Sequence, residues 1–204
     1  MRFLFYGATK FNSNINDWNT SSVNNMGWMF RDAQAFNQPL DNWDVSQVIN
    51  MAAMFAGTLS FNQDISGWDM SNKTSLGGMF RGATSFNQNI GSWDTSNVWD
   101  MSNMFAGATS FNGDISGWKV GNATNMSMMF SGSTAFNQPL GSWDVSKVTD
   151  MSSMFRDAMS FDQNLGNWKP LSLTTATNFL YGVKLSVPNY DALLNGWAGN
   201  VLNS

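Results

Sequence analysis

The sequence repeats with a period of 25 residues, seven times, without insertion or deletion. Each repeat opens with a phenylalanine, which recurs at Phe11, Phe36, Phe61, Phe86, Phe111, Phe136 and Phe161. A tryptophan follows seven residues later, at Trp18, Trp43, Trp68, Trp93, Trp118, Trp143 and Trp168. An unbroken period of roughly 20–50 residues is typical of repeat arrays, in which each unit contacts its neighbours. We therefore expect one elongated domain rather than two compact ones.

Three segments can be distinguished within each repeat. The first, FNQx[IL]xxW, predicts a short strand around the Ile or Leu and a bend before the tryptophan. The second, WD[VTM]S, contains residues typical of turns and helix N-caps. The third, VxxMxxMFxGA, spaces its apolar residues as a short helix does, and its glycine stands where a helix C′ residue would. Asp32 and Asp157 replace that glycine in two units, and aspartate tolerates left-handed geometry.

A strand and a short helix in constant order predict an α/β solenoid, a right-handed array of 25-residue strand–short-helix repeats. We expect residues 1–10 to form a partial repeat, residues 11–185 the seven full repeats, and residues 186–204 a C-terminal capping helix. The apolar positions of this last segment have the spacing of one helix face: Tyr190, Leu193, Leu194 and Trp197.

The chain starts in the middle of a unit, which leaves an apolar end without a polar cap. Two hypotheses concern this end. In the first, the chain is a fragment of a longer protein. In the second, the open N-terminal end docks onto another chain, self-association included.

A further column follows the opening phenylalanine and carries a side-chain amide in all units but the last. Its members are Asn12, Asn37, Asn62, Asn87, Asn112, Asn137 and Asp162. An amide offers two donors and an acceptor, so stacked copies can bond to turn backbone of their own and the next unit. We therefore predict a structural ladder, and a row of ligand-binding amides is the alternative.

The tryptophan column is predicted to be structural core. It keeps a fixed position beside Ile or Leu, and a buried tryptophan gives a small unit a large apolar area. A platform of stacked tryptophans that binds sugar is the alternative hypothesis. Trp28 and Trp99 lie outside the column. Because no repeat constraint explains them, we predict these two as exposed contact residues.

The composition removes most of the groups that catalysis uses. The chain has no His and no Cys, so neither a Ser–His–Asp nor a Cys–His arrangement can form. No phosphate-binding glycine motif occurs. Carboxylates recur, but the Asp column after the tryptophan is interrupted by Asn19, Lys119 and Lys169, which argues against a regular metal row. We expect no catalytic residue, no metal site and no cofactor.

The charge pattern also excludes classes of partner. The formal net charge is −4 and the basic residues are scattered, so the sequence lacks the basic patch of a nucleic-acid-binding protein. No apolar stretch approaches the roughly 20 residues of a membrane-spanning helix. The residues after Met1 do not form a signal-peptide pattern. We therefore expect no nucleic-acid partner and no membrane span.

The unit FNxDISxWDVSxVxDMSxMFxGA resembles the 25-residue repeat of the BspA-like leucine-rich-repeat surface proteins, the DUF285 family. Residues 136–158, FNQPLGSWDVSKVTDMSSMFRDA, show it well. The resemblance covers about residues 1–185, and the closing NYDALLNGW is similar to the cap of bacterial members. The departures from the pattern are local: Lys73 and Ala123 in the Val column, Leu76 in a Met column and Gly121 in the Ser column.

The resemblance implies a leucine-rich-repeat-like fold in an extracellular or cell-surface protein, whose partner is a protein or glycan on a cell surface or matrix. It supplies no catalytic residues. Our leading hypothesis is a non-enzymatic surface or secreted repeat protein that mediates adhesion or protein–protein interaction. The alternatives are a self-assembling structural element, such as a fibre or surface array, and a carbohydrate-binding repeat module. Since the invariant residues hold the repeat together, function is expected where the sequence does not repeat.

Overall fold

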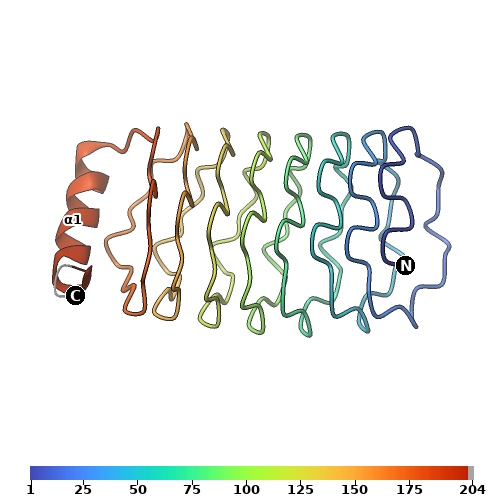
Figure 1. The fold of residues 1–204 in the computed structure, drawn as a ribbon, viewed down its shortest axis with the longest axis horizontal. Coiled ribbons are helices and arrows are strands. Elements are labelled where there is room, and N and C mark those ends of the chain that lie inside the picture. The colour runs from blue at the N-terminus through green and yellow to red at the C-terminus, as the bar shows by residue number, and fades with distance from the viewer. Residues whose placement is uncertain (202–204) are drawn as a thin grey trace.

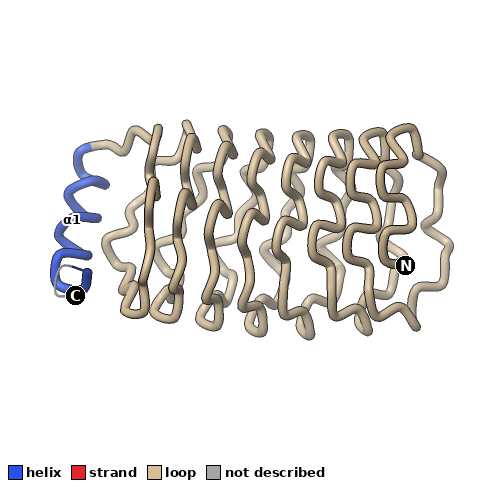
Figure 2. The backbone as a smooth tube through the Cα atoms, in the orientation of Figure 1, coloured by secondary structure: helices blue, strands red, loops and turns tan. Residues whose placement is uncertain are grey.

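The computed structural model describes the backbone of residues 1–201 and the side chains of residues 1–198. The chain winds through coils that stack along one axis, one coil for every 25 residues (Figure 1). Figure 2 shows that turns and loops make up these coils. One helix, α1, spans Val187–Val201 at the C-terminal end of the described chain. Residues 202–204 of the predicted cap lie outside the described residues.

Single pairs of residues hold successive coils in register. Six isolated parallel bridges join residues 25 positions apart: Asn25–Asn50, Asn50–Ser75, Ser75–Asp100, Asp100–Asn125, Asn125–Asp150 and Asp150–Thr175. Each coil therefore rests on the equivalent positions of the next. The predicted array of 25-residue units with a helix at its C-terminal end is confirmed.

The predicted short helix in each unit is wrong, because the VxxMxxMFxGA segment forms a series of β-turns. In residues 103–108 the backbone N–H groups alternate between two kinds of acceptor. Asn103 N–H donates to Ser127 O of the next coil at 2.8 Å, whereas Met104 N–H donates to Met101 O, three residues back, at 3.3 Å. A helix would direct every N–H along its own axis. Here alternate N–H groups join neighbouring coils instead.

Two columns of left-handed residues produce these turns. The first is the Gly or Asp position of the motif, where Gly82 has a φ of +69° and Asp32, as predicted, a φ of +60°. The second lies four residues earlier and includes residues with no left-handed preference, such as Trp28 (φ +58°) and Met128 (φ +56°). Two left-handed residues four positions apart interrupt a right-handed helix. Bonds to the next coil hold this backbone, as when Trp28 N–H donates to Ala52 O at 3.0 Å.

The predicted strand in each unit is wrong as well, since side chains take the bonds that a strand ladder needs. No residue of the described backbone belongs to an extended strand. Asn62 N–H donates to Asn37 Oδ1 at 2.9 Å, and Asn87 N–H donates to Asn62 Oδ1 at the same distance. A parallel ladder would pair these N–H groups with backbone carbonyls. The predicted strand segments are therefore joined by side-chain oxygens.

Stacked aromatic rings fill the inside of the coils. The ring of Phe55 is fully buried, and its centroid lies 5.6 Å from that of Phe30 and 5.7 Å from that of Phe80. It also stacks on Phe61 of its own coil at 4.1 Å. Methionines such as Met54 complete the interior. The apolar spacing that resembles a helix thus marks the inward-facing positions of successive turns.

Helix α1 covers the C-terminal end of the described stack. Trp197 continues the tryptophan column, because its ring stacks on Trp168 at 6.4 Å and its Nε1 donates to a backbone carbonyl of the last coil at 3.2 Å. Leu193 is buried beside it. Tyr190 and Leu194, which the spacing placed on the same apolar face, are exposed instead. Two of the four predicted positions therefore pack on the stack.

Candidate functional site

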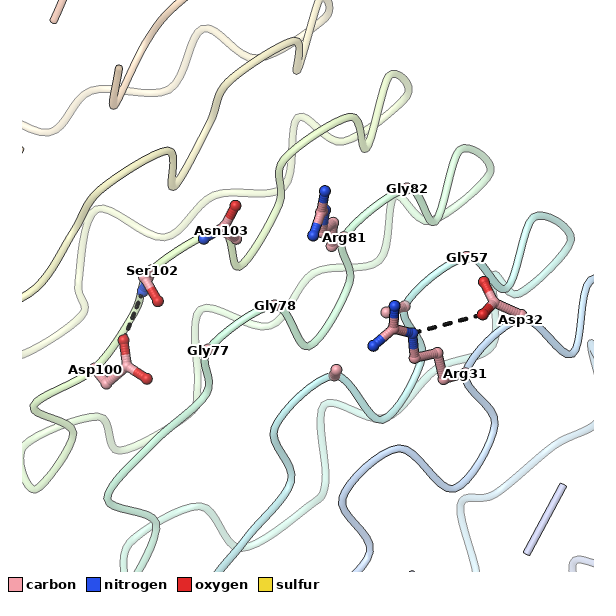
Figure 3. Close-up of a pocket in the computed structure, with 12 residues that line it drawn as sticks. Arg31, Asp32, Gly57, Gly77, Gly78, Arg81, Gly82, Asp100, Ser102 and Asn103 are labelled. Atoms are coloured by element: carbon pink, nitrogen blue, oxygen red, sulfur yellow. Dashed lines mark hydrogen bonds and ion pairs between the residues drawn. The ribbon is translucent and has the colours of Figure 1, made fainter. Parts of the chain in front are cut away.

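A groove of about 480 Å³ crosses the face that carries the left-handed turns (Figure 3). We call this face the turn face; it consists of the two left-handed columns and the residues between them. Half of the lining residues are glycine or alanine: Ala53, Ala56, Gly57, Gly77, Gly78 and Gly82. The other half are charged or polar: Arg31, Asp32, Arg81, Asp100, Ser102 and Asn103. The site is therefore a hollow lined by small residues and bordered by polar side chains.

The groove lies where one variable column becomes small and a second column alternates arginine with alanine. The first column contains, in order, Trp28, Ala53, Gly78, Asn103 and Met128. The second contains Arg31, Ala56, Arg81 and Ala106. The backbone of both columns keeps the same register in every coil. A change in side-chain size alone therefore hollows the surface.

Gly77 lies close to a carboxylate of the neighbouring coil. A Cβ atom built on Gly77 would come within 2.6 Å of Asp100 Oδ2. Asp100 is held in place, since Oδ2 accepts from Ser75 Oγ at 2.9 Å and Oδ1 accepts from Ser102 N–H at 3.1 Å. At Gly78 a Cβ atom would meet only ordinary contacts, at 3.8 and 4.0 Å. A side chain at Gly77 would therefore displace the Asp100 carboxylate, whereas one at Gly78 would make no close contact at its Cβ atom.

Arg81 differs from the other arginines of its column. Arg31 forms an ion pair with Asp32 at 3.5 Å and lies over the Tyr6 ring at 5.7 Å. Arg156 makes the same two contacts, at 3.3 Å with the aspartate that follows it and at 5.2 Å with a tyrosine of the next coil. A glycine follows Arg81. Within the described chain the exposed Arg81 guanidinium has no ion pair, side-chain hydrogen bond or aromatic contact, so its N–H donors are free for a ligand.

Asn103 stands on the coil next to Arg81 (Figure 3), and its side-chain amide has no hydrogen-bond partner among the described residues. Most backbone N–H groups of the lining are already bonded. Gly78 N–H donates to Ser102 O at 2.7 Å, and Ala53 N–H donates to Gly77 O at 2.9 Å. The groove therefore offers side chains, rather than main chain, to a bound molecule.

The predicted asparagine ladder lies outside the groove. Each side-chain oxygen accepts the backbone N–H of the next member at 2.8–2.9 Å, from Asn12 through to Asp162. Glutamines add a second donor, as when Gln63 Nε2 donates to Asn37 Oδ1 at 2.9 Å. At the end of the row, Asp162 Oδ1 accepts Ser186 N–H at 2.8 Å. The protein itself thus occupies the oxygens that a ligand row would use.

The tryptophan column is mostly buried. Six members are at most 5% exposed: Trp43, Trp68, Trp93, Trp118, Trp143 and Trp168. Each donates from Nε1 to a carbonyl of the preceding coil, as Trp93 does to Ile65 O at 3.1 Å. Trp18 departs from the predicted core, because it stands in the first full coil and is 38% exposed. The six buried rings present no stacked platform to a sugar.

The two tryptophans outside the column have different surroundings. Trp99 is 50% exposed. Trp28 is half-buried, since its ring stacks on Phe3 at 5.4 Å and Arg2 lies over it at 4.9 Å. Neither tryptophan lines the groove. Trp99 and the groove are therefore separate candidate surfaces.

Lys73 is a charged side chain inside the stack. It occupies the Val column and is fully buried. Its Nζ donates to Val45 O at 2.9 Å, to Asp69 O at 3.0 Å and to Asn72 Oδ1. Burial lowers the pKa of Lys73 to about 8, and the nearby carboxylates of Asp69 and Asp44 oppose this effect. The sequence shows that a lysine replaces valine at this position, but it does not show the three oxygens that accept hydrogen bonds from Lys73 Nζ.

The groove residues were not singled out by sequence reasoning. The available signal was departure from the repeat: Gly77 and Gly78 form a consecutive glycine pair that no other repeat contains, and Arg81 stands between two alanines of its column. The glycine that follows Arg81 removes one possible partner, but the sequence does not show whether another carboxylate reaches the arginine. The departure from the repeat therefore indicates where the groove lies, but not which kind of ligand it binds.

The recurrent carboxylates stabilise turns. Asp69 Oδ1 accepts Ser71 N–H at 2.9 Å, and Asp144 Oδ1 accepts Ser146 N–H at 3.0 Å. Hydrogen bonds from the serine hydroxyl and then from its backbone lower the pKa of both carboxyl groups. Among the described residues, no three His, Cys, Asp or Glu side chains gather to hold a metal ion. The described helix is too short and too polar to cross a membrane.

Comparison with known protein families gives one result. Residues 1–93 and 74–192 match the family described as "Mycoplasma protein of unknown function, DUF285". The match extends over the repeats and into α1. No curated protein and no solved structure matches the chain. The chain belongs to the DUF285 family.

Proposed function

We propose that the chain is a non-enzymatic, surface-displayed or secreted repeat protein that binds another macromolecule in adhesion or protein–protein contact. The groove on the turn face is the observation that carries this proposal. Most of its lining residues stand at positions that vary between repeats, whereas the recurring columns are used mainly for bonds between coils and for the core. The relation to leucine-rich repeats and the location outside the cell follow from the resemblance to BspA-like proteins, and belong to the same proposal.

The dimensions of the groove suit an extended segment. Its lining residues come from four successive coils, between Arg31 and Asn103. With a spacing of ~4.8 Å between coils, the groove extends for about 15 Å. An extended peptide of about four or five residues covers that length. A partner can therefore place one chain segment across several coils.

Selection from a random peptide display library tests the proposal. The target is the immobilised 204-residue chain, and the comparison is a Gly78→Met variant, whose side chain fills the groove. Met128 has a left-handed φ of +56° in the same column, so the fold accommodates methionine there. Arg156→Gln, in the same column as Arg81 but outside the groove, is the matched control.

We expect enriched peptides that bind the wild-type chain and the Arg156→Gln control but not Gly78→Met. Unchanged thermal unfolding of the variant shows that the loss is not a folding defect. If no peptide is enriched over an unrelated target, or if the peptides bind Gly78→Met equally well, the groove is not the contact surface.

Trp99 supports a second candidate, the carbohydrate-binding module. Its half-exposed indole offers a flat apolar face to a sugar ring. Ile49, in the same column, is exposed as well. A glycan array with the wild type and with Trp99→Thr tests this candidate, since threonine occupies the column at Thr74 and Thr124. Binding that is lost in the variant supports it, and an array that both proteins leave empty contradicts it.

A further inference from the structure

We propose that the groove binds an acidic peptide segment of a protein partner and that Arg81 holds one of its carboxylates. This inference rests on the proposed function and adds the chemistry of the ligand. The groove is the place on the turn face where an unpaired guanidinium borders a floor without large side chains. Guanidinium and carboxylate match each other in a planar, two-point contact.

The charges around the groove favour a carboxylate at Arg81. Asp32 is paired with Arg31, and both oxygens of Asp100 accept hydrogen bonds from serine groups. Among the described lining residues, Arg81 is therefore the one charged group without a partner. An incoming carboxylate gains a charge-assisted hydrogen bond there and displaces no existing ion pair.

The bonded backbone N–H groups at the centre of the lining restrict how a peptide can bind. Because Gly78 N–H and Ala53 N–H already donate to neighbouring coils, a peptide cannot add to the stack as an extra strand. Recognition must come from side chains. Asn103 carries a free amide on the coil beside Arg81, and an amide can donate to a peptide carbonyl while it accepts from a peptide N–H. Arg81 thus binds a carboxylate of the peptide, and Asn103 binds the peptide backbone next to it.

The lining also favours a peptide over a polysaccharide. None of the twelve described lining residues is aromatic, so the groove lacks the stacking surface that a sugar face needs. Glycines at Gly77 and Gly78 instead let a peptide backbone approach closely. An acidic peptide is therefore the occupant that fits both the shape and the charge.

Fluorescence anisotropy with defined peptides tests the inference on the full chain. The probe is a short fluorescein-labelled peptide of serine and alanine with one central glutamate and an amidated C-terminus. Matched probes carry glutamine or lysine in place of the glutamate. A glutamine probe with a free C-terminus distinguishes a chain-end carboxylate from a side-chain carboxylate. Raising the salt from low ionic strength to about 0.15 M shortens the range of the attraction and should weaken binding.

We expect the glutamate probe to bind more tightly than the glutamine and lysine probes. Arg81→Gln should weaken it about tenfold, the effect of losing a charge-assisted hydrogen bond. Arg81→Lys should weaken it less, because the charge remains without the planar fork. Asn103→Gly keeps the left-handed backbone, as Gly78 does in the same column, and should weaken binding about fivefold. Arg156→Gln should leave it unchanged.

Two outcomes would overturn the inference. In one, Arg81→Gln and Arg156→Gln weaken the glutamate probe equally, which would indicate diffuse attraction to surface charge. In the other, neither carboxylate probe binds better than the amidated glutamine probe. If display peptides still lose binding in Gly78→Met, the groove is a contact surface for another chemistry and the proposed function survives. If they do not, both proposals fail.

Discussion

The asparagine ladder and the turn face join the same coils by different means. Along the ladder, a side-chain oxygen accepts the backbone N–H of the next coil, so the same side chain must recur, as Asn37 and Asn62 do. On the turn face, backbone bonds to backbone, and side chains can vary from Trp28 to Gly78 without changing the coil. The bonding chemistry therefore decides which surface can specialise. A ligand site is expected where the backbone alone maintains the fold.

Removing a ring beneath the turn face should have the largest effect. Phe105 is fully buried, and its ring stacks on Phe80 and Phe130 at 5.7 Å each and on Phe111 at 3.9 Å. Phe105→Ala should lower the free energy of unfolding by about 3–5 kcal/mol through lost burial and the cavity left behind. Denaturant unfolding measures it, with the volume-conserving Met104→Leu as control. A loss below about 1 kcal/mol would mean that the turns do not depend on the rings.

Lys73 sharpens the comparison, because a charged side chain bonds to the neighbouring coil at a position where most repeats carry valine. Lys73→Val should raise the free energy of unfolding at neutral pH by about 1–2 kcal/mol, since an ammonium is no longer held out of water. Val48 and Val98 show that valine fits the position. Chemical denaturation at neutral pH measures the change, and a destabilised variant would show that the three acceptors outweigh the burial.

The same lysine predicts a pH dependence. Its pKa of about 8 in the folded chain lies below the ordinary 10.5, so the unfolded chain binds more protons between these values. The free energy of unfolding should therefore rise as the pH increases from about 8 towards 10.5. Lys73→Val should remove this rise. A rise that persists in the variant would assign it to other groups.

Two amide deletions test the comparison directly. Asn87→Ala removes the ladder oxygen that accepts Asn112 N–H at 2.8 Å, and should cost about 1 kcal/mol. Asn103→Gly removes an unbonded amide of the turn face and keeps its left-handed backbone, so it should stay within about 0.5 kcal/mol of the wild type. Denaturant midpoints of the two variants measure the difference. Equal effects would contradict the division between the two surfaces.

Asp162, the last residue of the ladder, should make a smaller and pH-dependent contribution to stability. Hydrogen bonds from the Asn189 side chain and then from the Ser186 backbone lower the pKa of Asp162. The stability that Asp162 contributes is present above its ordinary pKa of 3.8 and should be lost as the pH falls through its lowered pKa. Acid should therefore loosen α1. Asp162→Asn keeps the accepting oxygen without the titration. Hydrogen exchange in α1 measures the loosening, and identical pH profiles for both proteins would contradict it.

The sequence predicts the period and the inward-facing side chains, because both follow from spacing. It also predicts the left-handed backbone at Asp32, since aspartate tolerates that geometry. It could not predict the same backbone at Trp28 or Met128, where the bond to the next coil overrides residue preference. One unforeseen column of left-handed residues is enough to convert the predicted helix into turns.

The candidate site was predictable only in part. The glycine pair at Gly77 and Gly78 marks an irregular place in the repeat. Arg31 and Arg81 occupy the same column, and their different environments depend on the residue that follows each of them, aspartate in one case and glycine in the other. Whether a neighbouring carboxylate reaches a guanidinium is a question of geometry. Spacing in the sequence does not contain that information.

The register of bonds between coils has a mechanical consequence. Every coil is joined to the next through the same kinds of bond at equivalent positions. Tension applied along the axis would load these junctions in series, and a coil that gave way would release 25 residues of slack, roughly 80 Å of extended chain. A protein that anchors one body to another would then lengthen in equal steps under load while its remaining coils stayed intact.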